Sequence, residues 1–109
     1  SKNELDNLCV ILDNNGLQLE TSIDEIVEPS SISDKFMSFG FNVIECDGHN
    51  ISSLIDAFNS ARTKKGMPTI IIAKTVKGKG VSFMENQIEW HGKAPNEEEY
   101  NKAMEELSK

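Results

Sequence analysis

Two short stretches in the second half of the sequence carry residues suited to bind an anion. The first, Lys74–Gly80, follows an apolar run and reads KTVKGKG; the second, Trp90–Lys93, reads WHGK. Backbone N–H groups of a glycine-containing loop and lysine ammonium groups attract phosphate, and a histidine can donate or accept a proton near neutral pH. The pattern predicts an anion-binding loop with His91 as candidate acid or base. A solvated loop, with His91 packed on the Trp90 indole, is the alternative that these residues leave open.

A second group of candidate ligands follows the first apolar run. Asp13–Gly16 reads DNNG, and its side-chain and backbone oxygens could bind a hard cation such as Mg²⁺. The same residue types are favoured in tight turns, so a plain turn is the alternative. His49 is a further candidate catalytic residue, but Asn50 directly after it is a typical helix N-cap, which favours a structural role for this loop.

Three runs are expected to form the strands that position these residues. They are Leu8–Leu12, Phe41–Cys46 and Thr69–Ala73. The first and third are continuously apolar, which is typical of strands buried on both faces of a parallel sheet. Helical patterns between them are long enough for parallel crossovers, so we expect an α/β fold, a parallel sheet with flanking helices. In such sheets ligands bind outside the carboxyl ends of the strands, where the candidate residues lie.

Capping signals place the expected helices. Ser31 and Asp34 resemble a capping box, which predicts a short helix that ends at Gly40, and Asn50 and Asn96 are expected to cap the later helices. The apolar stripe expected on the second helix comprises Ile51, Leu54, Ile55, Phe58 and Ala61, and that on the last helix comprises Tyr100, Met104 and Leu107. The acidic side chains expected to be solvated are Glu97, Glu98, Glu99, Glu105 and Glu106. Residues 18–28 are expected to be irregular, with a short helical turn.

Composition limits the class of protein. A chain of 109 residues forms one domain, and its net charge of -7 argues against nucleic-acid or anionic-membrane partners. The sequence has no apolar run near the roughly 20 residues of a membrane span. Cys9 and Cys46 show no metal or disulfide spacing, and we expect reduced, buried thiols in a cytoplasmic protein. Because the chain starts at Ser1 and soon enters a strand, we expect a fragment or a processed chain.

Five segments, taken in order, resemble the transketolase family. They are Asp13–Leu19, Phe39–Ile44, Asp47–Asn50, Lys74–Gly80 and Trp90–Lys93. The resemblance implies that residues 1–109 form the second, C-terminal half of the thiamine-diphosphate-binding (diphosphate-side) domain or N-terminal subunit of a split-type transketolase. The parent enzyme would transfer a two-carbon ketol unit from a ketose phosphate to an aldose phosphate, in the pentose phosphate pathway.

The resemblance also implies roles for residues in the first turn. The side-chain oxygen of Asn15 and the backbone carbonyl of Leu17 would ligate the divalent metal, Mg²⁺ or Ca²⁺. Leu19 would lie near the thiazolium side of the cofactor. All three residues are therefore expected to contact the metal or thiamine diphosphate.

The remaining implied site residues lie in the basic loop and the histidine segment. Lys77 matches a basic residue of the vertebrate-like loop, and Gly78 would allow close backbone approach to the cofactor. His91 matches the histidine that contacts the diphosphate and lies near the donor substrate, so it is the candidate catalytic residue. A metal-bridged diphosphate would thus be held between an oxygen-bearing turn and a basic loop.

Several parts of the family site are missing from the sequence. It lacks the Gly-Asp-Gly segment that opens the cofactor motif. The glutamate that activates the aminopyrimidine comes in this family from a pyrimidine-side domain or subunit that lies across a dimer interface. The missing remainder of the enzyme is therefore an expected partner, and the isolated chain is expected to be inactive. The alternatives are a fragment of another thiamine-diphosphate enzyme, similar to deoxyxylulose-phosphate synthase, and a non-catalytic α/β binding module.

Overall fold

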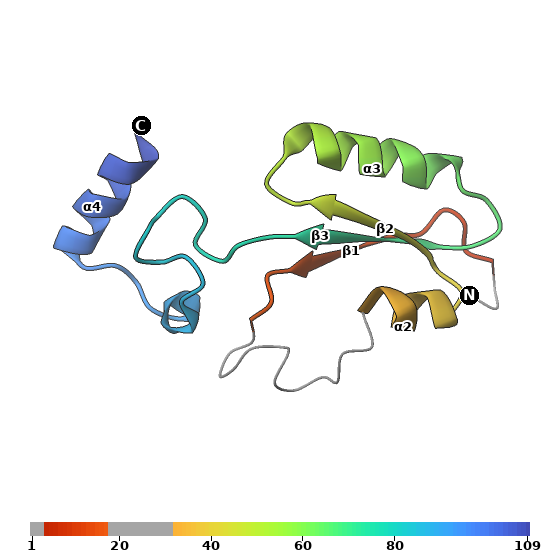
Figure 1. Cartoon of the computed structure of the whole chain (residues 1–109), viewed down its shortest axis with the longest axis horizontal. Coiled ribbons are helices and arrows are strands. Elements are labelled where there is room, and N and C mark those ends of the chain that lie inside the picture. The colour runs from red at the N-terminus through yellow and green to blue at the C-terminus, as the bar shows by residue number, and fades with distance from the viewer. Residues whose placement is uncertain (1–3, 18–31) are drawn as a thin grey trace. The chain divides into compact units, whose positions relative to one another are not determined.

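The computed structural model describes residues 4–17 and 32–109 as an α/β arrangement (Figure 1). Its elements, in chain order, are β1 (Cys9–Asn14), α2 (Ile32–Ser38), β2 (Asn42–Asp47), α3 (Ile51–Thr63), β3 (Thr69–Lys74), the 3₁₀ helix η1 (Ile88–His91) and α4 (Glu97–Leu107). The predicted fold class is confirmed. The expected irregular segment at residues 18–28 lies outside the described residues.

The chain divides into two compact units. We call the first, Ser1–Asn14 with Val27–Thr75, the sheet unit, and the second, Asn15–Ile26 with Val76–Lys109, the loop unit. The sheet unit contains the three strands with α2 and α3, and the loop unit contains η1 and α4. Each unit is described by itself.

The sheet is parallel, with the strand order β1-β3-β2. The central strand β3 is buried on both faces, because Ile70, Ile71 and Ile72 are at most 1% exposed. The two other strands pair with β3 in the same register, so that Asn14 and Asp47 both lie opposite Lys74. The three strands therefore end level with one another, and the loops that follow them leave from one edge of the sheet.

Helices α2 and α3 cover opposite faces of the sheet (Figure 1). The helix α3 begins at its predicted cap, because the Asn50 side chain accepts a hydrogen bond of 3.0 Å from the Ser53 N–H. It packs on the sheet through Ala57 and Ala61, which contact Ile71. Gly40 follows α2 with a φ of 81°, the left-handed conformation expected after a helix end.

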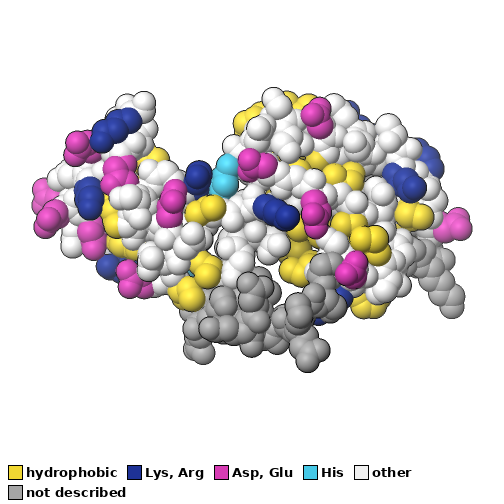
Figure 2. All heavy atoms as spheres, viewed as in Figure 1, with side chains coloured by type: hydrophobic (Ala, Val, Ile, Leu, Met, Phe, Trp, Pro, Cys, Tyr) yellow, Lys and Arg dark blue, Asp and Glu magenta, His cyan; other side chains and the backbone are white. Residues whose placement is uncertain are grey.

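The prediction that the apolar residues of β1 and of the helical stripes of α3 and α4 are buried is wrong for many of them. Strand β1 lies at an edge of the described sheet, so its side chains alternate between exposed and half-buried, and Ile11 is 55% exposed. Helix α3 approaches the sheet through small alanines, which turns larger side chains outward, and Ile51 is 71% exposed. Hydrophobic side chains consequently reach the surface over α3 (Figure 2). The outward-facing residues of the two helical stripes are Ile51, Ile55, Phe58, Tyr100, Met104 and Leu107.

The cysteines and the strand ends also differ from expectation. Cys9 is exposed, because its strand is an edge, and Cys46 is half-buried beside the core cluster. Burial, with a smaller effect of the neighbouring Asp47 charge, raises the pKa of the Cys46 thiol. Asp13, which was expected in a turn, instead continues β1 opposite Ala73. No helix among the described residues is long and apolar enough to cross a membrane.

A carboxylate on β2 gives the sheet unit a pH-dependent contact. The Ser33 hydroxyl donates a hydrogen bond to Glu45, and the Lys74 Nζ lies 3.6 Å from its other oxygen. The hydrogen bond and then the Lys74 charge lower the pKa of Glu45 below its ordinary 4.5. A lowered native pKa contributes stability above the unfolded-state pKa, and this contribution is lost as the pH falls through the native value.

We therefore expect Ser33→Ala to reduce the free energy of unfolding at neutral pH by less than about 1 kcal/mol, because Glu45 is half-exposed and solvent screens the interaction. The difference from the wild type should narrow as the pH falls through the lowered native pKa of Glu45, because the carboxyl group is then protonated in both states. Urea unfolding at neutral pH and over a series of acid pH values measures it. A loss of equal size at every pH would show that the Glu45 charge is not involved.

Candidate anion-binding site

The segment after β3 folds into consecutive turns. The Asn86 N–H donates to the Lys77 carbonyl at 2.9 Å, and the Val81 N–H donates to the Gly78 carbonyl at 3.1 Å. Val81 is buried, at 5% exposed, and anchors the turns within the loop unit. The backbone hydrogen bonds of this segment are those of turns, which agrees with the lack of helical or strand periodicity in its sequence. These bonds close the segment into a compact loop.

Gly78 is required by this closure. Its φ is 74°, and a Cβ atom placed on it would lie 2.5 Å from the Met84 carbonyl oxygen. The backbone of the loop itself therefore occupies the space beside Gly78 on that side. The resemblance assigned the small residue to cofactor approach, and the structure supplies a separate reason for it in the contact with Met84.

The cations of the loop unit differ in whether they are already paired. Lys79 lies 3.9 Å from Glu85, and Lys93 lies 3.2 Å from Glu99. By contrast, the half-buried Lys77 side chain and the exposed His91 ring have no hydrogen bond, ion pair or ring contact with any residue in the described ranges 4–17 and 32–109. Lys77 and His91 are therefore the basic groups of the two predicted stretches that can turn to an external anion.

The turn after β1 is an Asx-turn. The Asn15 Oδ1 accepts a hydrogen bond of 2.9 Å from the Leu17 N–H, and Gly16 between them has a φ of 73°. The plain-turn interpretation and the ligand interpretation are compatible here, because an amide oxygen has a second lone pair. The Asn15 amide and the Leu17 carbonyl are hard oxygen donors of the kind that Mg²⁺ and Ca²⁺ prefer. Leu19 lies outside the described residues.

Among the described residues, the oxygen donors of this turn are neutral. Asp13, the carboxylate that precedes the turn in the sequence, accepts a hydrogen bond of 2.5 Å from the Thr75 hydroxyl. Within the part of the chain that the structure describes, no group of three or more His, Cys, Asp or Glu side chains could hold a metal ion. The described residues thus fit part of a metal coordination shell.

The Asp47–Asn50 loop is held by hydrogen bonds that stabilise its own backbone and the start of α3. The His49 N–H donates to Asp47 Oδ1 at 2.8 Å, and the Asn50 side chain caps α3. The Gly48 N–H donates to the Lys74 carbonyl at 2.8 Å, and a Cβ atom at Gly48 would lie 2.5 Å from Thr75 Cγ2. These contacts agree with the structural interpretation that the sequence favoured for this loop.

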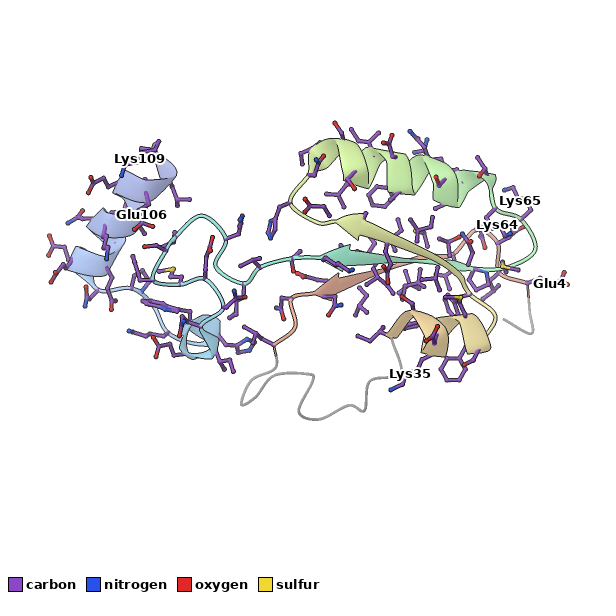
Figure 3. All side chains as sticks on the ribbon, in the orientation of Figure 1. Glu4, Lys35, Lys64, Lys65, Glu106 and Lys109 are labelled. Carbon is purple, nitrogen blue, oxygen red and sulfur yellow. The ribbon has the colours of Figure 1, made fainter. Side chains whose placement is uncertain are left out.

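The acidic residues of α4 are not all solvated, which corrects the expectation for Glu99 and Glu106. Both oxygens of Glu106 accept hydrogen bonds from Ser82, at 2.5 Å from its N–H and 2.7 Å from its hydroxyl, and these bonds lower the pKa of Glu106. Figure 3 shows Glu106 on α4, one residue before the end of that helix. Glu106 therefore ties α4 to the turns of the loop, while basic and acidic side chains remain intermixed on the surface around α4 (Figure 2).

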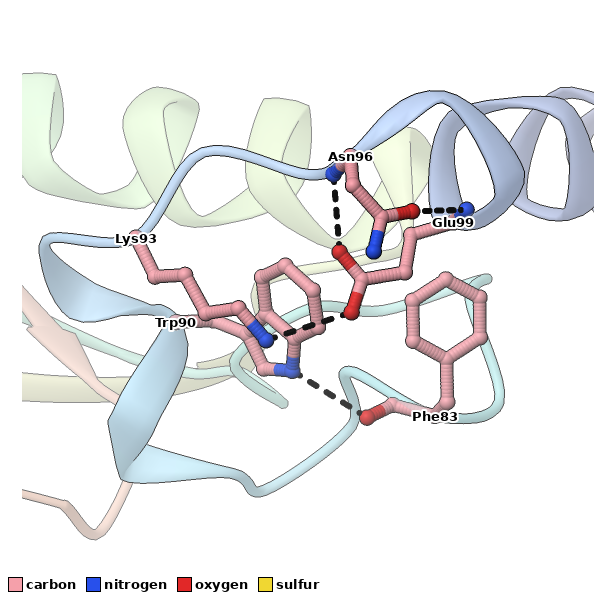
Figure 4. A network of polar contacts seen from close by, with 5 residues as sticks. All are labelled: Phe83, Trp90, Lys93, Asn96 and Glu99. Atoms are coloured by element: carbon pink, nitrogen blue, oxygen red, sulfur yellow. Dashed lines mark hydrogen bonds and ion pairs between the residues drawn. The ribbon is translucent and has the colours of Figure 1, made fainter.

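Trp90 and Lys93 form a contact that the sequence patterns did not predict (Figure 4). The Lys93 Nζ lies 4.2 Å from the centroid of the Trp90 ring, so the indole packs against a lysine, and the alternative in which His91 packs on it is wrong. The only sequence signal for this contact is the capping box of Asn96 and Glu99, which brings a carboxylate to Lys93. The Asn96 N–H hydrogen bond, followed by the effect of Lys93, lowers the pKa of Glu99.

The parallel sheet, with helices between its strands and a glycine-containing loop after its central strand, places the chain in the class of parallel α/β domains. Within that class, residues 1–108 match the family described as transketolase, thiamine diphosphate binding domain. The chain belongs to this family.

Similar proteins include transketolase subunits and proteins named as transketolases. The chain is 41% identical over 104 residues to an apulose-4-phosphate transketolase subunit of Actinobacillus succinogenes. The aligned region covers 95% of this chain and 37% of that protein. The chain is 37% identical over 105 residues to the same subunit of Phocaeicola vulgatus, covering 96% and 37%. The Campylobacter jejuni transketolase structure superposes with a TM-score of 0.87 at 29% identity, covering 98% of this chain and 17% of that one. The chain thus spans little more than a third of these curated subunits.

Proposed function

We propose that the chain is the C-terminal half of the diphosphate-side domain of a transketolase and supplies part of a thiamine-diphosphate and divalent-metal site. The observation that carries this proposal is the pairing of the cations. In the described loop unit, Lys79 and Lys93 have acidic partners, whereas Lys77 and His91, the residues implied by the resemblance, have none. Unpaired basic groups beside a glycine-containing turn match the chemistry of a diphosphate.

Each residue of the proposed site has a defined task. The Asn15 side-chain oxygen and the Leu17 carbonyl would hold the metal, and Leu19 would contact the cofactor on its thiazolium side. Lys77 binds the diphosphate as a point charge, and the His91 imidazole holds or moves a proton at the diphosphate and donor-substrate side. Thiamine diphosphate, when bound, supplies the electron sink for carbon–carbon bond cleavage.

The parent reaction proposed is transfer of a two-carbon ketol unit from a ketose phosphate to an aldose phosphate. The relatives that are named as subunits of a transketolase support a partner polypeptide that carries the pyrimidine side, with a dimer in the full enzyme. The outward apolar residues of β1 and α3 support burial against further parts of the protein. Relatives named as transketolases disfavour the synthase-like alternative.

A matched pair of lysines tests the proposed site. In the assembled enzyme, Lys77→Met should weaken thiamine-diphosphate binding by about 10- to 100-fold, the effect of losing a charge-assisted hydrogen bond. Lys79→Met should change it by less than about threefold, because Lys79 already faces Glu85 and is exposed. Titration calorimetry with the cofactor measures both dissociation constants. Equal losses for the two variants would leave only a non-specific charge effect and contradict the assignment.

The chain alone should bind thiamine diphosphate weakly or not at all. Its described metal donors are neutral, so a Mg²⁺–diphosphate complex gains no anionic protein ligand from them. Calorimetry of the 109-residue chain with cofactor, with and without Mg²⁺, is the measurement. Tight, Mg²⁺-dependent binding would show that the site is complete within this chain.

A further inference from the structure

Lys93 is held from two sides within the loop unit. Its ammonium group lies 3.2 Å from Glu99 Oε1 and 4.2 Å from the centroid of the Trp90 ring (Figure 4). A cation placed over an indole and paired with a carboxylate already has partners for its charge. Lys93 therefore differs from Lys77, whose side chain has no such contact with the described residues.

Both partners of Lys93 are themselves fixed. The other oxygen of Glu99 accepts the Asn96 N–H at 2.8 Å, and the Glu99 N–H donates to Asn96 Oδ1 at 2.9 Å, which closes a capping box at the start of α4. The Trp90 Nε1–H donates to the Phe83 carbonyl at 3.2 Å, and the two rings meet edge to face at 5.6 Å. Lys93 thus joins the start of α4 to the turns that precede η1.

His91 lies in the chain between the two joined residues. It ends η1, and its ring has no polar contact with the described residues, so no interaction with them through its own side chain holds it. Its backbone neighbours are Trp90, which is fixed by Phe83 and Lys93, and Gly92, which precedes Lys93. We propose that Lys93 is a positioning residue that fixes His91 through the Trp90 ring and Glu99, and that it is not itself an anion ligand.

This inference rests on the proposed role of His91, but it can be tested without catalysis. Nuclear magnetic resonance relaxation of the 109-residue chain gives the backbone order of Trp90, His91 and Gly92. In Lys93→Met, which keeps the aliphatic stem and removes the charge, the order parameters of these residues should fall from the about 0.85 of a rigid backbone toward 0.6. Lys93→Arg should restore them, because a guanidinium group can make both contacts. Unchanged order in Lys93→Met overturns the inference.

Glutamine variants give the matched control. Glu99→Gln keeps a side chain that can close the capping box and removes the charge facing Lys93, so it should reproduce the loss of order in Lys93→Met. Glu98→Gln removes an exposed charge from the same turn of α4 and should leave the order unchanged. Equal effects of the two glutamine variants would indicate a general charge effect and contradict the inference. A thermal midpoint close to that of the wild type shows that each variant remains folded.

Inorganic pyrophosphate separates a positioning role from a ligand role. Trp90 is the only tryptophan of the chain, so its fluorescence reports binding next to His91. If Lys93 positions His91, Lys93→Met and Glu99→Gln should both weaken pyrophosphate binding by about 3- to 10-fold, and the double variant should be no weaker than the single variants. If Lys93 is a ligand, Glu99→Gln frees its charge and tightens binding while Lys93→Met weakens it, which overturns the inference.

The two proposals fail in different ways. No response of the wild-type His91 signals to pyrophosphate at millimolar concentration would contradict the proposed anion site. The order parameters in the absence of any ligand would still decide whether Lys93 fixes His91.

Discussion

If the proposed function holds, replacing His91 with alanine in the assembled enzyme should lower turnover with a donor ketose by about 10²- to 10⁴-fold, the usual contribution of a positioned acid–base residue. His91 is exposed and its ring makes no polar contact with the described residues, so its removal should leave the fold intact. Steady-state kinetics with a ketose phosphate, together with circular dichroism of the variant, measure the two effects separately.

The other histidine of the chain is the control for this experiment. His49 lies in a loop whose backbone is held by Asp47 and by the cap of α3, and we assign it no chemical role. His49→Ala should therefore retain most of the turnover. Unchanged kinetics in His91→Ala would remove His91 from the site, and the assignment of the histidine segment would have to be abandoned.

Gly78→Ala should destabilise the loop unit by about 3 kcal/mol, because it combines a left-handed backbone with a steric clash. The added Cβ would lie 2.5 Å from the Met84 carbonyl oxygen and 2.6 Å from its carbon, so the loop closure must open. Urea unfolding followed by Trp90 fluorescence reports the stability of this unit, since Trp90 is the only tryptophan.

Gly16→Ala isolates the contribution of the clash. Gly16 has nearly the same φ, 73°, but a Cβ placed on it meets nothing within 4 Å. Gly16→Ala should therefore lower the free energy of unfolding only through the strain of the left-handed backbone, by about 1 kcal/mol. If the two alanine variants shift the unfolding midpoint equally, the close approach to Met84 contributes nothing and Gly78 is needed for its φ alone.

The parts of the fold that sequence predicted well depend on local chemistry. Asn50 and Asn96 cap helices because their side chains reach N–H groups three residues ahead, and this spacing is visible in sequence. The central strand β3 was predicted correctly because a continuous apolar run is typical of a strand with neighbours on both sides. The same rule failed for β1, because a run of apolar residues does not reveal how many strands lie beside it.

Less of the candidate site could be predicted from the sequence. Lys77 and Lys79 are two lysines of the same short stretch, and the sequence does not distinguish them. They differ in the structure because a turn brings Glu85 close to Lys79. The Trp90–Lys93 contact depends on the orientation of one ring relative to the start of α4, which residue types do not encode. Asn15 was predicted both as a turn residue and as a ligand; the structure confirms the turn, and the ligand role stays a prediction.

The edge position of β1 bears on how the protein is produced in a cell. Among the described strands, β1 has a neighbour on one side only, and its residues CVIL combine an exposed Ile11 with high β-propensity. Such an edge is a template on which strands of other chains can add, so newly made copies face a competition between assembly and aggregation. We expect coverage of the β1 edge to shift that competition away from aggregation.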